Sequence, residues 1–357
     1  MHLSRLQEDG LEYRRLGNTD LMVSAIVQGT MTFGTSNTEA EAATLLDMAQ
    51  ERGVTTIDTA EMYPSPPDHS HYGETERIIG RWLKARGGRE HLILASKVAG
   101  RSTKGYMRPW GGETRLDRAN IETALDQSLS RLQTDYIDLY QLHWPDRKTN
   151  IFGRMEYRHD PADDAIALEE TLDVLAGLVR AGKIRHIGLS NENPWGLMRA
   201  AEWARHHPGV EIASIQNAYS LVSRLFEATL AEICHHENIG LLAYSPLAMG
   251  LLTGKYCAGQ RPPQARLVKY SYYDRYTAPQ ALSAAEQYSA IARDHGYAPN
   301  QMALAYLRSK PFLAGAIIGA TSPEQLRSNI DSVAITLPAE IIKKIEAVHR
   351  QFPNPCP

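Results

Sequence analysis

Three ionisable side chains stand at the ends of three successive apolar, β-rich runs of this sequence. The runs are VTTID, LILASK and YIDLYQLH, and they end at Asp58, Lys97 and His143. A phenol is close by, because Tyr63 comes five residues after Asp58. Taken singly, a polar residue at a strand end usually hydrogen-bonds a neighbouring loop. Adjacent strands lie only about 5 Å apart, so consecutive strands would bring all four side chains together.

A carboxylate, an ammonium, a phenol and an imidazole at one point suit the reduction of a carbonyl group. Hydride addition to the carbonyl carbon leaves an alkoxide that needs a proton, and a free phenol, with a pKa of about 10, is a weak acid. The ammonium of Lys97 would lower the phenol's pKa, and Asp58 would keep that ammonium charged. An imidazole could orient the carbonyl oxygen. The pattern therefore predicts Tyr63 as the proton donor, supported by Asp58, Lys97 and His143.

Short β-rich runs alternate with amphipathic helical stretches along the chain. We count eight such units, with strands expected at 25–29, 54–58, 92–97, 136–143, 183–190, 212–219, 240–246 and 315–320, and helices that include 38–53, 118–132, 165–182 and 223–240. The apolar runs are nearly continuous, which is typical of parallel strands buried on both faces. Eight units predict an α/β fold of the (β/α)8 TIM-barrel class. The rival, an open doubly wound sheet, usually carries G-x-G-x-x-G after its first strand, and this spacing is absent.

The elements suggest one domain over residues 1–357, because no linker divides the chain. We expect a short hairpin at 13–24 before the first barrel strand, and a helix and tail at 338–357. The connections 144–163 and 247–278 are long, and long connections in compact domains are usually functional. Both follow strands, so both should lie at the C-terminal face, where this fold has its active sites.

The composition limits the cellular compartments and the classes of partner to be expected for this protein. A net charge of −3 and a pI near 6.5 give no basic footprint for nucleic acid. Cys234, Cys257 and Cys356 follow no disulfide or zinc spacing, which favours a reducing compartment. No run reads as a signal peptide or a membrane span, so we expect a cytoplasmic protein without membrane attachment. The acidic and histidine-rich stretch DHSHYGE has no second ligand cluster, so no metal site is predicted.

Several of these stretches resemble the aldo-keto reductase superfamily. The likeness runs over essentially the whole chain, and its strongest pieces are IDTAEMY, ILASKV, RLQTDYIDLYQLHWPD, GKIRHIGLSN, SIQNAYSL and LLAYSPLAMGLLTGKY. Three further pieces are most similar to the bacterial Tas-type members, namely AEMYPSPP, LHWPDRKTNIFG and GATSPEQLRSNI. The resemblance implies a catalytic tetrad at Asp58, Tyr63, Lys97 and His143, and NADPH-dependent reduction of a small aldehyde or ketone.

The family pattern leaves two tyrosines to compare. The family's tyrosine comes five residues after the aspartate, as Tyr63 does, but it is normally followed by glycine, as Tyr72 is. An insert at 64–72 divides the pattern between the two residues. Distance from the strand end favours Tyr63, and we interpret Tyr72 as a loop residue.

The resemblance also implies where a nicotinamide dinucleotide would lie, extended across the barrel without a Rossmann domain. The matching residues are Gly29, Thr30, Met31, Asp58, Ser190, Asn191, Gln216, Tyr244, Ser245, Pro246, Leu247, Lys255, Arg266, Gly319, Thr321, Gln325 and Asn329. Arg266 suits a bidentate phosphate contact and favours NADP(H) over NAD(H). Gln325 and Ser328 depart from residues that many relatives carry, which weakens the 2′-phosphate and adenine assignments.

Aromatic and sulfur-containing residues are candidates for the wall of an apolar substrate pocket. They are Met31, Phe33, Trp144, Phe152 and Tyr157. The physiological substrate, its stereochemistry and the oligomeric state are left open.

Two other functions are compatible with the pattern. The superfamily includes non-enzymatic subunits that sense the cofactor or bind a partner, but there an amide commonly replaces the tetrad histidine, so His143 argues against this. A barrel aldolase would use Lys97 as a Schiff-base nucleophile.

Overall fold

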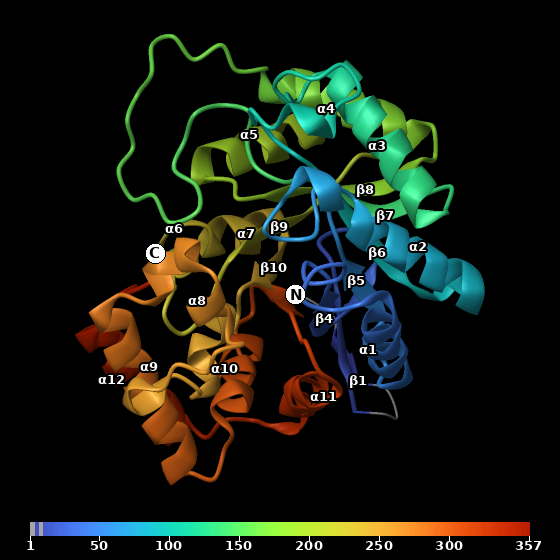
Figure 1. Ribbon diagram of the computed structural model, residues 1–357. Helices are drawn as coiled ribbons and strands as arrows, with labels where there is room; N and C mark the ends of the chain where they lie inside the picture. The colour runs from blue at the N-terminus through green and yellow to red at the C-terminus, as the bar shows by residue number, and fades with distance from the viewer. Residues whose placement is uncertain (1–3, 7–9) are drawn as a thin grey trace.

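The computed structural model describes residues 4–6 and 10–357 and consists of a closed barrel with helices around it (Figure 1). The barrel strands are β4 (Ile26–Gly29), β5 (Thr56–Asp58), β6 (Ile93–Val98), β7 (Ile137–Leu142), β8 (Ile184–Ser190), β9 (Ile212–Ala218), β10 (Gly240–Tyr244) and β11 (Leu313–Ile318). In the described residues these eight strands are parallel and follow one another in chain order around the closed barrel, which confirms the predicted (β/α)8 fold. Every residue of β5, β7 and β11 is buried, as the continuous apolar runs predicted.

An antiparallel sheet lies before the barrel. Its strands are β1 (Ser4–Leu6), β2 (Glu12–Arg15) and β3 (Met22–Ser24). Strands β2 and β3 form the predicted hairpin, and β1 adds a strand that the sequence pattern had not indicated. The hairpin turn includes Gly17 at φ 59°, where a Cβ would lie 2.7 Å from the carbonyl oxygen of Ala213, so only glycine fits. Leu16 and Leu21 pack with inner barrel residues such as Val27.

Helices cover the outside of the barrel, apart from one short helix, α8 (Arg266–Lys269), which lies in the connection after β10. They are α1 (Glu39–Glu51), α2 (Glu74–Arg86), α3 (Arg118–Leu132), α4 (Leu168–Arg180), α5 (Pro194–Arg205), α6 (Leu225–Thr229), α7 (Ala231–Glu237), α8 (Arg266–Lys269), α9 (Pro279–Asp294), α10 (Pro299–Arg308), α11 (Pro323–Asp331) and α12 (Ala339–Gln351). Helix α1 begins in a capping box of Thr38 and Glu41, and the side chain of Ser322 caps α11. One prediction was wrong: the helix expected at 223–240 is two short helices, because the backbone leaves helical values at Leu230. No helix within the described ranges combines the length and apolar character that crossing a bilayer needs.

Long connections follow β7 and β10. The connection after β7 arches away from the barrel (green in Figure 1) and leads to α4. The connection after β10 contains η4 (Ala248–Thr253), η5 (Cys257–Gly259), α8 and η6 (Ser271–Tyr276). Because both leave the C-terminal ends of parallel strands, they border the same face of the barrel.

Candidate active site

Asp58 and Lys97 form a buried ion pair at neighbouring strand ends. Asp58 is the last residue of β5, and Lys97 lies on β6, which pairs with β5 in parallel. The Nζ of Lys97 donates to Oδ2 of Asp58 at 2.6 Å and to the carbonyl oxygen of Thr59 at 2.7 Å. Gln216 donates to the other carboxylate oxygen at 2.8 Å and Gln141 at 3.3 Å. Both oxygens of Asp58 are therefore satisfied, as a buried carboxylate requires.

Tyr63 and His143 meet above this ion pair. The Nζ of Lys97 lies 5.0 Å from the centre of the Tyr63 ring. The rings of Tyr63 and His143 are 5.8 Å apart and nearly perpendicular. His143 is buried, and its Nδ1 has no hydrogen-bond partner among the described residues. The four side chains that the sequence singled out are thus brought together.

Burial decides the charge of the two rings. Burial, and after it the Asp58 carboxylate, raise the pKa of Tyr63 well above its usual 10. This differs from the sequence argument, which expected the Lys97 ammonium to lower that pKa; in the structure, burial and Asp58 raise it. Burial, and then Lys97, hold the pKa of His143 well below 6.5. Near neutral pH the phenol is protonated and the imidazole is uncharged.

Tyr72 occupies a different environment. Its hydroxyl donates to Oε2 of Glu61 at 2.8 Å, and its ring packs with Tyr106. Tyr63 lines the main pocket of the described residues, whereas Tyr72 does not. Geometry therefore separates the two tyrosines, and only Tyr63 faces the pocket together with His143.

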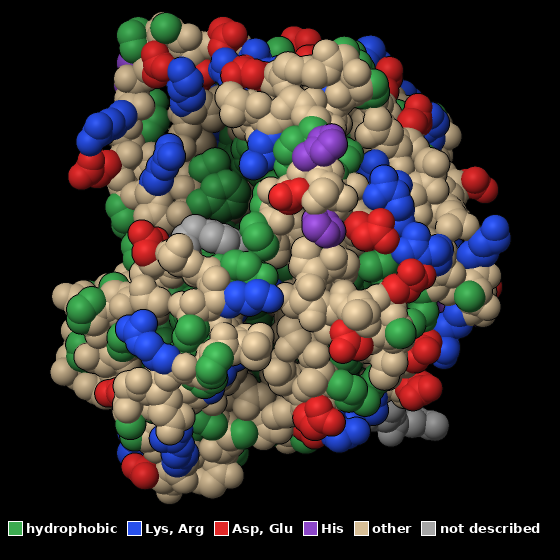
Figure 2. Space-filling model, in the orientation of Figure 1, with side chains coloured by type: hydrophobic (Ala, Val, Ile, Leu, Met, Phe, Trp, Pro, Cys, Tyr) green, Lys and Arg blue, Asp and Glu red, His purple; other side chains and the backbone are tan. Residues whose placement is uncertain are grey.

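The pocket has a volume of about 1350 Å³. Figure 2 shows this face of the molecule hollowed between the loop after β7 and the segment around α8. Every residue matched to the cofactor lines it: Gly29, Thr30, Met31, Asp58, Ser190, Asn191, Gln216, Tyr244, Ser245, Pro246, Leu247, Lys255, Arg266, Gly319, Thr321, Gln325 and Asn329. Lys97 is absent from the lining because it is buried beneath Tyr63.

Side chains at the ends of β8 and β10 are held in place by one another. Asn191, at φ 52°, donates to the carbonyl oxygen of His143 at 2.9 Å and accepts from the hydroxyl of Tyr244 at 2.8 Å. The hydroxyl of Ser190 donates to the carbonyl oxygen of Gln216 at 2.8 Å. This arrangement sets fixed polar groups in the pocket wall near His143, and they are candidates to hold the carboxamide of a nicotinamide.

Two cations in the pocket wall fit an anionic ligand. Neither Lys255 nor Arg266 has a carboxylate partner in the part of the chain that is described; Arg266 lies 3.6 Å from the sulfur atoms of Met31 and Met249 and stacks over the ring of Tyr273. Burial, and then Arg266, lower the pKa of Lys255. Both side chains are half-buried, and a partly desolvated cation without a counter-ion is unfavourable, so these residues fit the phosphates of a dinucleotide.

The expected apolar wall is present only in part. Met31, Trp144 and Phe152 line the pocket. The prediction was wrong for Phe33, which is buried in the main core, and for Tyr157, which is exposed and lies outside the lining. Neither position could be judged from residue type alone, because each depends on how a loop turns after its strand.

Sequence reasoning also missed residues around the tetrad. Gln141 contacts Asp58, and it could have been found because it stands two residues before His143, on the same side of β7. The buried pair of Glu61 and Arg108 beside the Tyr63 turn gave no sequence signal, since its partners come from separate loops.

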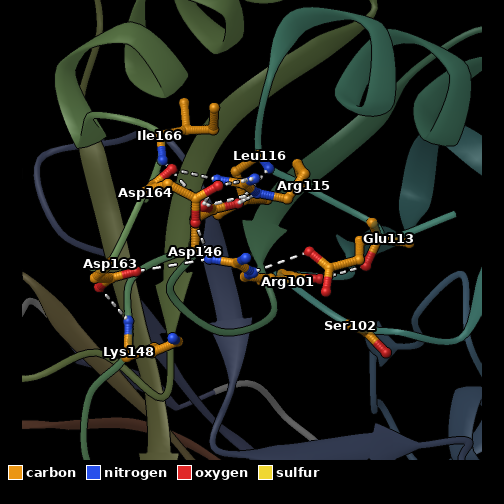
Figure 3. A network of polar contacts seen from close by, with 12 residues as sticks. Arg101, Ser102, Glu113, Arg115, Leu116, Asp146, Lys148, Asp163, Asp164 and Ile166 are labelled. Carbon is orange, nitrogen blue, oxygen red and sulfur yellow. Dashed lines mark hydrogen bonds and ion pairs between the residues drawn. The ribbon is translucent and has the colours of Figure 1, made fainter. Parts of the chain in front are cut away.

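A polar network holds the loop after β7 (Figure 3). Asp146 is buried and accepts from the Arg115 guanidinium at 3.0 Å and from the amides of Leu116 and Ile166 at 2.9 and 3.0 Å. Arg101 adds an ion pair to Asp164 at 2.6 Å. These contacts fix both ends of the loop that carries Phe152 into the pocket.

Comparisons with known proteins agree with this architecture. The chain folds into a barrel whose pocket opens at the C-terminal strand ends. The aldo/keto reductase family model matches residues 25–350, and the chain belongs to this family of oxidoreductases. It is 47% identical over 349 residues to Protein tas of Escherichia coli (strain K12), which covers 97% of this chain and 100% of the relative. It is 34% identical over 351 residues to Uncharacterized oxidoreductase YrpG of Bacillus subtilis (strain 168), with 97% of each chain covered. It is also 40% identical over 283 residues to an aldo-keto reductase of Babesia bovis, with 74% of this chain and 98% of the relative covered. The resemblance to Tas-type members is thereby confirmed.

Proposed function

We propose that this oxidoreductase reduces aldehydes or ketones to alcohols with NADPH, with Tyr63 as the proton donor. The proposal rests on the proximity of four side chains in the pocket. Tyr63 and His143 face the pocket, and the Lys97–Asp58 ion pair lies directly behind Tyr63.

Each residue has a distinct part in the reaction. A bound reduced nicotinamide would supply the hydride that adds to the carbonyl carbon. Tyr63 gives its phenolic proton to the oxygen made negative by that addition, and the Lys97 ammonium stabilises the phenolate left behind. Asp58 keeps Lys97 charged in its buried position. His143, neutral because burial lowers its pKa, directs an N–H toward the carbonyl oxygen.

NADP(H) is the proposed cofactor, in preference to NAD(H). Support comes from Lys255 and Arg266, two pocket cations without carboxylate partners in the described residues, because a 2′-phosphate adds negative charge to the ligand. Gln325 contributes less to this preference, since its side chain accepts from the amide of Thr321 at 3.2 Å.

The other two candidate functions have less support. An aldolase needs a free lysine amine, but Nζ of Lys97 is engaged by Asp58 and by the Thr59 carbonyl, away from the pocket lining. A cofactor-sensing subunit has no use for a complete set of proton-transfer residues, and His143 is part of that set here.

Location and organisation are also proposals. Cys234, Cys257 and Cys356 are free thiols, which supports a reducing compartment and so the cytoplasm. One domain over residues 1–357 agrees with a family match that spans residues 25–350.

The first test compares wild type, Tyr63→Phe and Tyr106→Phe in NADPH oxidation with a panel of aldehydes and ketones. Loss of a positioned general acid typically costs 10²- to 10⁴-fold, so we expect kcat to fall by about that factor in Tyr63→Phe with NADPH affinity retained. Tyr106→Phe is the matched control, because its hydroxyl has no hydrogen-bond partner in the described part of the chain and lies outside the pocket.

Full turnover by Tyr63→Phe would reject Tyr63 as the donor. If wild type bound NADPH and reduced no compound of the panel, the reductase proposal would fail, and the cofactor-sensing function would take its place.

A further inference from the structure

A second buried ion pair lies beside the turn that carries Tyr63. Glu61 comes three residues after Asp58 and two before Tyr63. Its Oε2 accepts from one Arg108 nitrogen at 2.8 Å, and its Oε1 accepts from the other at 3.1 Å. The side chains of Glu61 and Arg108 are both 0% exposed, and neither lines the pocket. The pair therefore makes no contact with substrate, and its role has to be sought in the elements it joins.

Glu61 joins the Tyr63 turn to the strand end that carries Lys97. The amide of Ala99, two residues after Lys97, donates to Oε1 of Glu61 at 2.7 Å. The backbone amide of Glu61 also donates to the carbonyl oxygen of Lys97 at 3.2 Å. Any displacement of the Glu61 carboxylate would thus change the position of Tyr63 relative to Lys97.

Tyr72 completes the set of donors around this carboxylate. Its hydroxyl donates to Oε2 of Glu61 at 2.8 Å, beside the Arg108 contact on the same oxygen. A further hydrogen bond fixes the Arg108 guanidinium, because its Nε donates to Oδ1 of Asn120 on α3 at 2.8 Å. The 64–72 insert therefore reaches the tetrad indirectly, through the hydroxyl of its last residue.

This geometry suits positioning rather than stability alone. A buried ion pair contributes little net stability relative to apolar residues, but loss of one partner leaves a charge uncompensated. Proton transfer depends steeply on distance, and a misplacement of about 1 Å can cost on the order of 100-fold in rate. The Glu61 carboxylate accepts four hydrogen bonds, two from Arg108 and one each from Ala99 and Tyr72, and these bonds restrain the turn.

We propose that Glu61, Arg108 and Tyr72 are positioning residues that hold the Tyr63 turn against the end of β6. Tyr72, the second tyrosine of the split family pattern, acts on the reaction through Glu61 and not as a proton donor. The catalytic part of this inference rests on the proposed function.

The test uses Tyr72→Phe, which removes only the hydroxyl, with Tyr106→Phe as the matched control from the same aromatic cluster. We expect kcat of Tyr72→Phe to fall about 10-fold, with KM and NADPH affinity within about twofold of wild type. A purely structural role would lower the folded fraction and leave kcat per folded molecule unchanged. Glu61→Gln, which keeps the side-chain volume but loses the charge, should show a larger loss of kcat with the same KM pattern.

A second measurement does not require turnover. Backbone hydrogen exchange of full-length protein should be faster in Tyr72→Phe than in Tyr106→Phe at Ala99 and at residues 59–63, with β8 unchanged. If wild type reduces no carbonyl compound, the proposed function fails while exchange still decides whether the turn is held. Equal exchange in the two variants, or faster exchange with unchanged kcat in an active enzyme, would overturn the inference.

Discussion

At the scale of single residues, burial sets the ionisation states on which the proposed chemistry depends. Tyr63 is a neutral phenol because burial and Asp58 raise its pKa, and His143 is a neutral imidazole because burial and Lys97 lower its pKa. Both states suit reduction, since the phenol keeps the proton it must deliver and the imidazole can donate a hydrogen bond without a net charge.

His143 should make folding stability depend on pH. Its pKa in the folded protein lies well below 6.5, the ordinary value expected in the unfolded chain. As the pH falls through about 6.5, His143 binds a proton in the unfolded chain but not in the native state. The stabilising contribution is therefore fully present above that pH, and the free energy of unfolding declines below it by up to about 1.4 kcal/mol per pH unit. Urea unfolding between about pH 7.5 and 5.5 should show a shallower decline for His143→Gln than for wild type.

The exposed residue His91 provides the control for this measurement, because His91→Gln also removes one imidazole, but from the surface. Parallel curves for wild type and His143→Gln would contradict the expectation that His143 stays neutral in the native state.

At the scale of elements, the buried carboxylate of Asp146 lies at the centre of the network that holds the loop after β7 (Figure 3). Asp146 bonds Arg115 on the preceding segment and the amides of Leu116 and Ile166, so it joins the two ends of the loop. The loop itself has few apolar contacts, because Phe152, Met155 and Tyr157 are exposed. Its position therefore depends on the polar contacts at its base.

Asp146→Asn should lower the free energy of unfolding by about 1–3 kcal/mol, because an amide nitrogen would face donors that now bond a carboxylate. Asp164→Asn is the matched control; its side chain is 65% exposed, so its ion pair with Arg101 should contribute little to stability. Chemical denaturation of both variants measures the difference in the free energy of unfolding. Equal losses would show that the buried carboxylate of Asp146 contributes no more to stability than the exposed one of Asp164.

At the scale of the whole molecule, the pocket collects residues from nearly the full length of the chain. Its lining begins at Gly29 after the first barrel strand and ends at Asn329 on α11. A ligand in this pocket would contact both ends of the barrel closure, where β11 pairs with β4. Binding should therefore stabilise the native state as a unit.

NADPH should raise the melting temperature, since a ligand at 100 times its Kd adds about 2.7 kcal/mol. We expect a smaller shift with NADH, and Arg266→Met should reduce the NADPH shift more than the NADH shift. Arg350→Met, which removes an exposed arginine on α12, serves as the charge-matched control. Equal shifts with the two cofactors in wild type would remove the support for a preference for NADP(H).

Much of the molecule could be predicted because its signals are local. Asp58, Lys97 and His143 were found because three apolar runs end in them, and eight apolar runs with helices between them sufficed to predict the barrel. The prediction failed where the sequence carries no mark of a helix break. The 223–240 stretch has helical periodicity throughout, and the break appears only in the backbone angles at Leu230.

The amino-acid sequence by itself determined the barrel and the strand ends at which the candidate catalytic side chains stand, because hydrophobic periodicity is a property of neighbouring residues. Only the tertiary structure decided which tyrosine faces the pocket, that burial and Asp58 raise the pKa of Tyr63, and that Glu61 meets Arg108 and Tyr72. These outcomes depend on distances between segments far apart in the chain and on the exclusion of water from between them, and neither can be inferred from the order of neighbouring residues.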